Sequence, residues 1–120
     1  MTKQEILGLW GEAQIADYLK TLGYRILETR WRCRFGEIDL IAVQDSFLCF
    51  VEVKLRKDDS MAPARAFVTP AKQKRIRISA ALYLTEHPSR LQPRLDVAEI
   101  YAPYGINTKK PNIIYLENAF

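Results

Sequence analysis

Long apolar runs are missing from this chain of 120 residues. No stretch approaches the roughly 20 apolar residues that a membrane-spanning helix needs, and the first residues carry no apolar core of a signal peptide. These absences predict a soluble, cytoplasmic protein with no membrane partner.

Cysteine and histidine are scarce, with two cysteines and one histidine. Cys49 stands within an apolar run and is expected to pack as a small hydrophobic side chain, whereas Cys33 lies in an arginine-rich connection. The three residues lack the spacing of a zinc site, and His87, just before Pro88, is expected at a helix end. The composition therefore gives no support to a cysteine-histidine metal centre.

The order of apolar patterns predicts one α/β domain. With 48% hydrophobic residues, a chain of this length buries roughly two thirds of its unfolded surface in a single core. We expect one domain over residues 1–120, with a mixed central sheet flanked by helices. The expected elements are a helix from the capping box of Thr2 and Glu5 to near Gly23, an edge strand at 24–31, a hairpin at 37–55, a mobile loop at 57–67, a helix at 69–86, and strands at 94–101 and 112–116.

The most apolar stretch, residues 47–55, carries Glu52 and Lys54 near its end. A strand that is apolar on both faces is expected in the centre of a sheet, where an unpaired charge is unfavourable. These two charges are therefore expected to pair or to bind a ligand.

A second carboxylate falls on the same face. Residues 37–44 are expected to form the partner strand, and if residues 45–46 form a two-residue loop, Asp39 lies directly opposite Glu52. If residues 44–45 form the loop, Asp39 lies diagonal to Glu52, and only a three-residue loop would separate the two. Two such carboxylates repel each other, and a hard divalent cation such as Mg²⁺ relieves the repulsion. The pattern predicts a metal site at Asp39 and Glu52.

These motifs also carry a family resemblance. Gly-Glu-Ile-Asp-Leu-Ile at 36–41, then Val-Glu-Val-Lys at 51–54, resembles the core of the PD-(D/E)XK, or restriction-endonuclease-like, nucleases. Further motifs resemble the small bacterial YraN-like family within that superfamily: Gly8-x-x-Gly11-Glu12, Gly23-Tyr24, Arg30-Trp31-Arg32, Thr69-Pro70-Ala71-Lys72 and Leu95-Asp96-Val97. The chain lacks the proline of the superfamily name and has Ile38 before Asp39 instead. Leu55 follows Lys54 where a small polar residue is more usual. Neither change removes a predicted ligand.

The resemblance implies a restriction-endonuclease-like fold and specific roles. Asp39, Glu52 and the carbonyl oxygen of Val53 would hold Mg²⁺ or Mn²⁺, which activates a bound water and offsets charge on the transition state. Lys54 would position or deprotonate the attacking water, for which its pKa must be lowered. Lys72 would contact the phosphate backbone.

Three other acidic residues keep competing interpretations. Glu12, beside Gly11 on the first helix, is a candidate third catalytic carboxylate or an exposed or arginine-paired glutamate. Glu37 is a candidate supporting group of the metal site or a partner of Lys54. Asp96 is expected to cap a backbone group or pair with an arginine.

Basic residues gather around the predicted site. Residues 54–77 hold eight basic side chains and two acidic ones, within a chain of net charge +4. Basic clusters beside aromatics favour a phosphate backbone, although any single one on a helix can be solvated surface. The candidate nucleic-acid-binding residues are Lys72, Lys74, Arg75, Arg32 and Arg34.

The sequence thus predicts a metal-dependent nuclease that acts on DNA rather than RNA. Branched or structured substrates are compatible with this prediction, and so is a homodimer. The alternative is a non-catalytic nucleic-acid-binding or assembly protein that retains the fold, because ligands do not prove turnover.

Overall fold

The computed structural model describes residues 1–57 and 68–120. The expected loop at 57–67 lies almost wholly outside the described residues. No helix in the described part is both long and apolar enough to cross a membrane.

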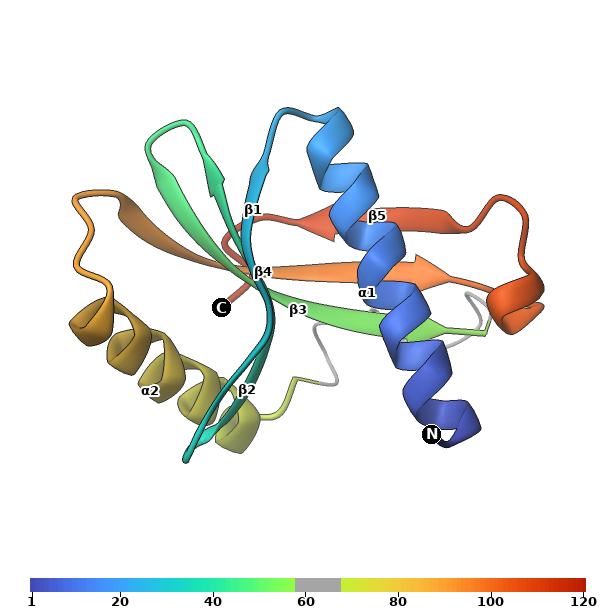
Figure 1. Ribbon diagram of the computed structural model, residues 1–120, viewed down its shortest axis with the longest axis horizontal. Coiled ribbons are helices and arrows are strands. Elements are labelled where there is room, and N and C mark those ends of the chain that lie inside the picture. The colour runs from blue at the N-terminus through green and yellow to red at the C-terminus, as the bar shows by residue number, and fades with distance from the viewer. Residues whose placement is uncertain (58–67) are drawn as a thin grey trace.

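One mixed sheet and two helices build this small α/β domain (Figure 1). The five strands lie in the order β1-β2-β3-β4-β5, all neighbours antiparallel except the parallel pair β3 and β4. The elements are α1 (Lys3–Thr21), β1 (Arg25–Cys33), β2 (Gly36–Gln44), β3 (Phe47–Arg56), α2 (Pro70–Glu86), β4 (Gln92–Tyr101), the short 3-10 helix η2 (Gly105–Asn107) and β5 (Asn112–Leu116).

Both helices begin at the predicted caps. Thr2 precedes α1 and its hydroxyl oxygen accepts a hydrogen bond from the Glu5 N–H at 3.1 Å. Thr69 caps α2 in the same way, accepting from the Lys72 N–H at 3.2 Å, and Pro70 takes the first helical position. His87 caps the end of α2, which confirms its expected place at a helix end.

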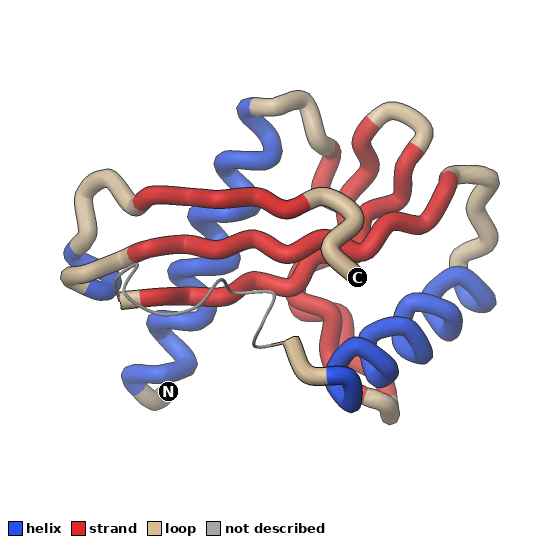
Figure 2. Tube along the Cα trace, turned by 180° about the vertical axis from the view of Figure 1, so that it is seen from behind, coloured by secondary structure: helices blue, strands red, loops and turns tan. Residues whose placement is uncertain are grey.

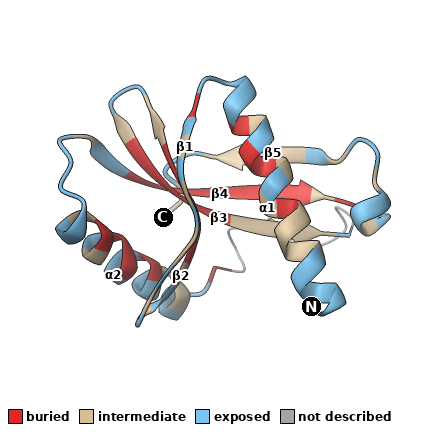
Figure 3. Ribbon diagram, viewed as in Figure 1, coloured by how far each residue is buried: buried red, intermediate tan, exposed pale blue. Residues whose placement is uncertain are grey.

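Each face of the sheet has its own apolar cluster, and the two helices cover opposite faces (Figures 1 and 2). Side chains alternate along β3, so Phe50 packs on the α2 face with Tyr83, while Cys49 and Val51 pack on the α1 face with Leu19. The buried positions gather on β3 and β4 (Figure 3). This arrangement confirms the prediction of β3 as a central strand and of Cys49 as a core side chain.

Asp96 organises a buried polar cluster on the α1 face and serves structure. It is 0% exposed and accepts hydrogen bonds from Arg94 Nε at 3.0 Å, the Tyr115 hydroxyl at 2.5 Å and the Asn118 N–H at 2.9 Å. The expected arginine partner is therefore Arg94. The same contacts fix the residues after β5 to β4.

Candidate functional site

The turn between β2 and β3 sets the position of the two predicted carboxylates. Asp45 adopts a left-handed φ of 51°, and Gln44 pairs with Phe47, so the loop has two residues. The pairing continues to Leu40 and Val51. Asp39 and Glu52 occupy the next positions along this register, where the strand ladder ends.

Asp39 bridges the gap that opens beyond the ladder. Its Oδ2 accepts a hydrogen bond of 2.8 Å from the Val53 N–H, which ties the end of β2 to β3. Glu52 is only 6% exposed. The first of the two registers considered from the sequence is thus the observed one, and both carboxylates face the same space.

That space is a small pocket of about 180 Å³ between β2, β3 and α2. Its lining includes Asp39, Glu52, Glu37, Lys72, Arg75 and Ser79. Because α2 begins at Pro70, its first turn brings Lys72 next to Glu52 on β3. The hairpin of β2 and β3 and the more distant α2 therefore converge on one polar site.

Two lysines compensate the charge of Glu52. Lys72 Nζ lies 2.6 Å from Glu52 Oε1, and Lys54 Nζ lies 4.0 Å from the same oxygen. Burial lowers the pKa of Lys54, and the charge of Lys72 lowers it further. Burial also opposes the charged form of Lys72, but its hydrogen bond and ion pair with Glu52 outweigh this and leave its pKa raised.

Within the described part of the chain, no ion pair joins Asp39 to a cationic side chain. Burial, followed by the charge of Glu52, raises its pKa from 3.8 to about 8, although the hydrogen bond from Val53 acts in the opposite direction. Keeping both Asp39 and Glu52 ionised at neutral pH therefore costs free energy. A bound cation is the arrangement that would relieve it.

Glu12 reaches the border of the site from α1. Gly11 allows this approach, because a Cβ there would lie 3.1 Å from Leu55 Cδ1. Glu12 Oε1 lies 3.4 Å from Arg30 Nε, but both atoms are buried and neither makes a hydrogen bond within the described residues. Burial raises the pKa of Glu12; Arg30 lowers it and the charges of Glu37 and Glu52 raise it. The arginine-paired interpretation is thus the observed state, and the catalytic role stays a prediction.

Arg30 holds an unusual backbone conformation in the middle of β1. Its φ is 51°, in the left-handed region that bulky residues seldom adopt. Its Nε lies 3.3 Å from Glu37 as well as near Glu12. Glu37 also lies 3.3 Å from Arg32 Nε, so its recorded ion pairs are with these two arginines and not with Lys54.

The donor set fits a hard divalent cation held by few protein ligands. Asp39 and Glu52 offer carboxylate oxygens in one pocket, and the pKa of Asp39 is raised by burial and then by the charge of Glu52, both of which a bound cation would offset. Within residues 1–57 and 68–120, no group of three or more histidine, cysteine or acidic side chains is placed to hold a metal. Mg²⁺ accepts one or two carboxylates and keeps waters or phosphate oxygens for the rest. The metal role of the Val53 carbonyl stays a prediction.

The predicted nucleic-acid-binding residues lie in different surroundings. Lys74 and Arg75 are exposed on α2, and Arg75 also lines the pocket. Arg32 is 72% exposed in its ion pair with Glu37. The guanidinium of Arg34 lies over the ring of Phe35, 4.8 Å from its centroid.

Sequence reasoning missed two parts of this arrangement. It placed Lys72 on a phosphate and did not anticipate its contact with Glu52, because the packing of α2 against β2 has no local signal. It also did not anticipate the left-handed backbone of Arg30, since an arginine gives no warning of a positive φ, whereas glycine or asparagine would have done so.

Comparison with known proteins identifies the family. A model of the family described as "Uncharacterised protein family UPF0102" matches residues 11–100. A UPF0102 protein of Mycolicibacterium gilvum is 38% identical, covering 92% of this chain and 90% of the relative. Those of Syntrophomonas wolfei and Roseiflexus castenholzii are 40% and 41% identical, over 95% and 94% of this chain and 96% and 91% of theirs. This chain belongs to the UPF0102 (YraN) family, as the motifs in its sequence predict.

Proposed function

We propose that this protein is a metal-dependent nuclease that hydrolyses phosphodiester bonds, with DNA as the expected nucleic acid and a restriction-endonuclease-like fold. The observation that carries the proposal is the pairing of Asp39 with Glu52 in one pocket that also contains Lys72. A purely structural ion pair would explain Glu52 and its lysines. It does not explain a second buried carboxylate, Asp39, which forms no ion pair within the described residues and whose pKa is raised to about 8.

Asp39 and Glu52 would hold the cation, Mg²⁺ or Mn²⁺, together with the Val53 carbonyl oxygen. When bound, the cation supplies Lewis-acid stabilisation and a water of lowered pKa. The Val53 N–H orients Asp39 Oδ2 for this task through its 2.8 Å hydrogen bond.

The two lysines divide the remaining tasks. Lys54 lies 4.0 Å from Glu52, and burial with the charge of Lys72 lowers its pKa, which moves it towards the range of a proton acceptor. Lys72 is an ammonium group at the mouth of the pocket and would bind a phosphate oxygen of the backbone once Glu52 is otherwise compensated. Glu12 would tune the charge of the site from its border.

The alternative is a nucleic-acid-binding or assembly protein without turnover. The exposed basic side chains of α2 and the arginines near Gly36 support this reading equally well, because binding needs only phosphate contacts. The two functions differ at Asp39 and Glu52, which a nuclease needs for metal binding and cleavage and a binding protein does not.

A substrate panel with matched variants separates them. Branched, flapped, single-stranded and duplex DNA, with RNA counterparts, are incubated with Mg²⁺, Mn²⁺ or EDTA, and isothermal titration follows Mn²⁺ binding. Asp39→Ala and Glu52→Ala should lose Mn²⁺ binding and cleavage, whereas Asp17→Asn, an exposed acid on α1, should keep both. Unchanged Mn²⁺ affinity in the two alanine variants would refute the metal assignment. Wild-type protein that cleaves nothing in the panel would favour the binding protein.

A further inference from the structure

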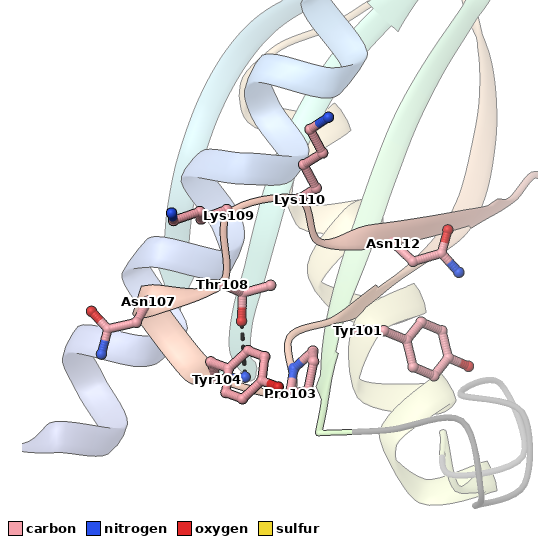
Figure 4. Close-up of a pocket in the computed structure, with 8 residues that line it drawn as sticks. All are labelled: Tyr101, Pro103, Tyr104, Asn107, Thr108, Lys109, Lys110 and Asn112. Atoms are coloured by element: carbon pink, nitrogen blue, oxygen red, sulfur yellow. Dashed lines mark hydrogen bonds between the residues drawn. The ribbon is translucent and has the colours of Figure 1, made fainter.

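The loop between β4 and β5 lies at the end of the sheet away from α2 (Figures 1 and 2). Residues of this loop and of the adjoining strand ends line a second pocket. Its volume is about 640 Å³, against about 180 Å³ for the carboxylate pocket. The lining contains Lys109 and Lys110 and no acidic residue (Figure 4). Neither lysine forms an ion pair with any residue in the described part of the chain. Among the described residues, the lining of the pocket therefore carries positive charge that no acidic side chain of the lining offsets.

The loop that forms this pocket is well ordered by hydrogen bonds. Gly105, with a left-handed φ of 58°, donates its N–H to the Ala102 carbonyl at 3.0 Å, and Thr108 donates to the Gly105 carbonyl at 3.0 Å. The Tyr104 N–H donates to the Thr108 hydroxyl at 3.0 Å, drawn as the dashed line in Figure 4. Yet the Tyr104 side chain is 77% exposed. A fixed backbone thus presents a large aromatic ring to solvent.

The strand register connects this pocket to the carboxylate site. Glu52 pairs with Val97 and Arg56 with Tyr101 in the parallel ladder of β3 and β4. Four residues along a strand span about 13 Å, and Tyr101 lines the second pocket. A stacked nucleic-acid strand advances about 3.4 Å per nucleotide, so the interval corresponds to about four nucleotides.

We propose that this second pocket binds an unpaired segment of the same nucleic-acid strand that the carboxylate site holds. A base stacks on Tyr104, and Lys109 and Lys110 contact the flanking phosphates. The inference rests on the proposed function and deepens it, because it names the substrate class: nucleic acid with a single-stranded segment reaching about four nucleotides or more past Asp39 and Glu52.

The chemistry of the lining selects an unpaired strand over a duplex. The bases of a duplex are stacked on one another and offer Tyr104 no free face, whereas an unpaired base stacks on any aromatic ring with little sequence preference. Lysine contributes a point charge that suits phosphate without reading a base. The pocket therefore distinguishes single-stranded from double-stranded nucleic acid and does not read the base sequence.

Fluorescence anisotropy in EDTA tests the proposal without any turnover. The probes are one duplex, blunt or carrying single-stranded tails of two, four or eight nucleotides at either end. Wild-type affinity should rise between the two- and eight-nucleotide tails at one end only. Tyr104→Ala should abolish most of that gain, about tenfold or more in affinity, whereas Tyr104→Phe should retain it.

A charge-matched pair of variants tests the lysines. Lys109→Ala/Lys110→Ala should weaken binding of the eight-nucleotide tail and reduce the log-log salt slope by about 0.7 for each lost phosphate contact. Lys20→Ala/Arg25→Ala, which removes two exposed charges elsewhere, should leave the gain from the tail unchanged. A tail carrying 5-iodouracil should crosslink to Tyr104 at the fourth nucleotide or beyond, because Tyr104 lies three residues past Tyr101.

Clear results would overturn the proposal. Equal affinity of wild type for blunt and tailed duplexes would do so, as would full tail dependence in Tyr104→Ala with a wild-type circular dichroism spectrum. Failure of the nuclease proposal alone would give a different result. The tail dependence and the crosslink would persist, but no metal-dependent cleavage would be found. The pocket would then belong to a binding protein.

Discussion

Replacing Asp39 by asparagine should stabilise the metal-free protein, and more so as the pH rises. In the folded state the pKa of Asp39 is about 8, against 3.8 for an ordinary aspartate. The unfolded chain therefore releases this proton at a lower pH than the folded chain. Stability from the protonated carboxyl is complete below pH 3.8 and is lost as the pH rises towards 8.

The size of the effect follows from the same shift. One pKa unit corresponds to about 1.4 kcal/mol, so a shift of about 4 units sets an upper limit near 6 kcal/mol at pH 8. Glu52, Lys54 and Lys72 share the same field and will take up part of it. We expect Asp39→Asn to gain between about 1 and 6 kcal/mol over wild type between pH 4 and pH 8. The asparagine side-chain oxygen still accepts the hydrogen bond from Val53.

Urea unfolding in EDTA at several pH values measures this difference directly, with Asp17→Asn as the control for a lost surface charge. Adding Mn²⁺ at pH 8 should reduce the advantage of the variant, because a ligand at 100 times its dissociation constant stabilises the wild type by about 2.7 kcal/mol and the variant lacks one of the metal ligands. Parallel stability curves for wild type and Asp39→Asn in EDTA would refute the reasoning about the buried carboxylate pair.

Three further outcomes can be checked on single preparations. Lys54→Ala should slow phosphodiester cleavage by about a hundredfold or more with little loss of binding; near-normal cleavage with a lowered melting temperature would make the lysine a structural counter-ion. Replacing Lys72, Lys74 and Arg75 on α2 by alanine should reduce the log-log salt slope of binding by roughly 0.7 to 0.9 per true phosphate contact. An unchanged slope would show that these three side chains are solvated surface. Asp96→Ala should lower the free energy of unfolding by about 3 to 5 kcal/mol, because Arg94, 6% exposed, loses its carboxylate; a loss below about 1 kcal/mol in urea titration would contradict this account.

The parts of the fold that follow from local chemistry could be predicted. The caps at Thr2 and Thr69 fixed both helix starts, and the apolar run around Phe50 identified the central strand. Both two-residue loops that the sequence allows place Asp39 and Glu52 on one face, and only a three-residue loop would separate them. Choosing between the loops needed the backbone of Asp45, whose left-handed φ the sequence only permits.

The parts that depend on packing between distant elements could not be predicted. The ion pair between Lys72 and Glu52 arises from how α2 lies against the sheet, and the ring of Tyr104 is exposed because of hydrogen bonds within its own loop. Proline and glycine identify that loop in the sequence, but they say nothing about the pocket it encloses.

The two-residue turn at Asp45 and Ser46 makes the hairpin intolerant of changes in length. Five residue pairs, about 17 Å, separate this turn from Asp39 and Glu52, yet the side chains of both face one pocket only in the observed register. One inserted or deleted residue in the turn would shift the ladder and direct Asp39 towards α1. Related proteins should therefore vary freely in the composition of this turn but keep its length, whereas the loop after β4 can lengthen without moving either carboxylate.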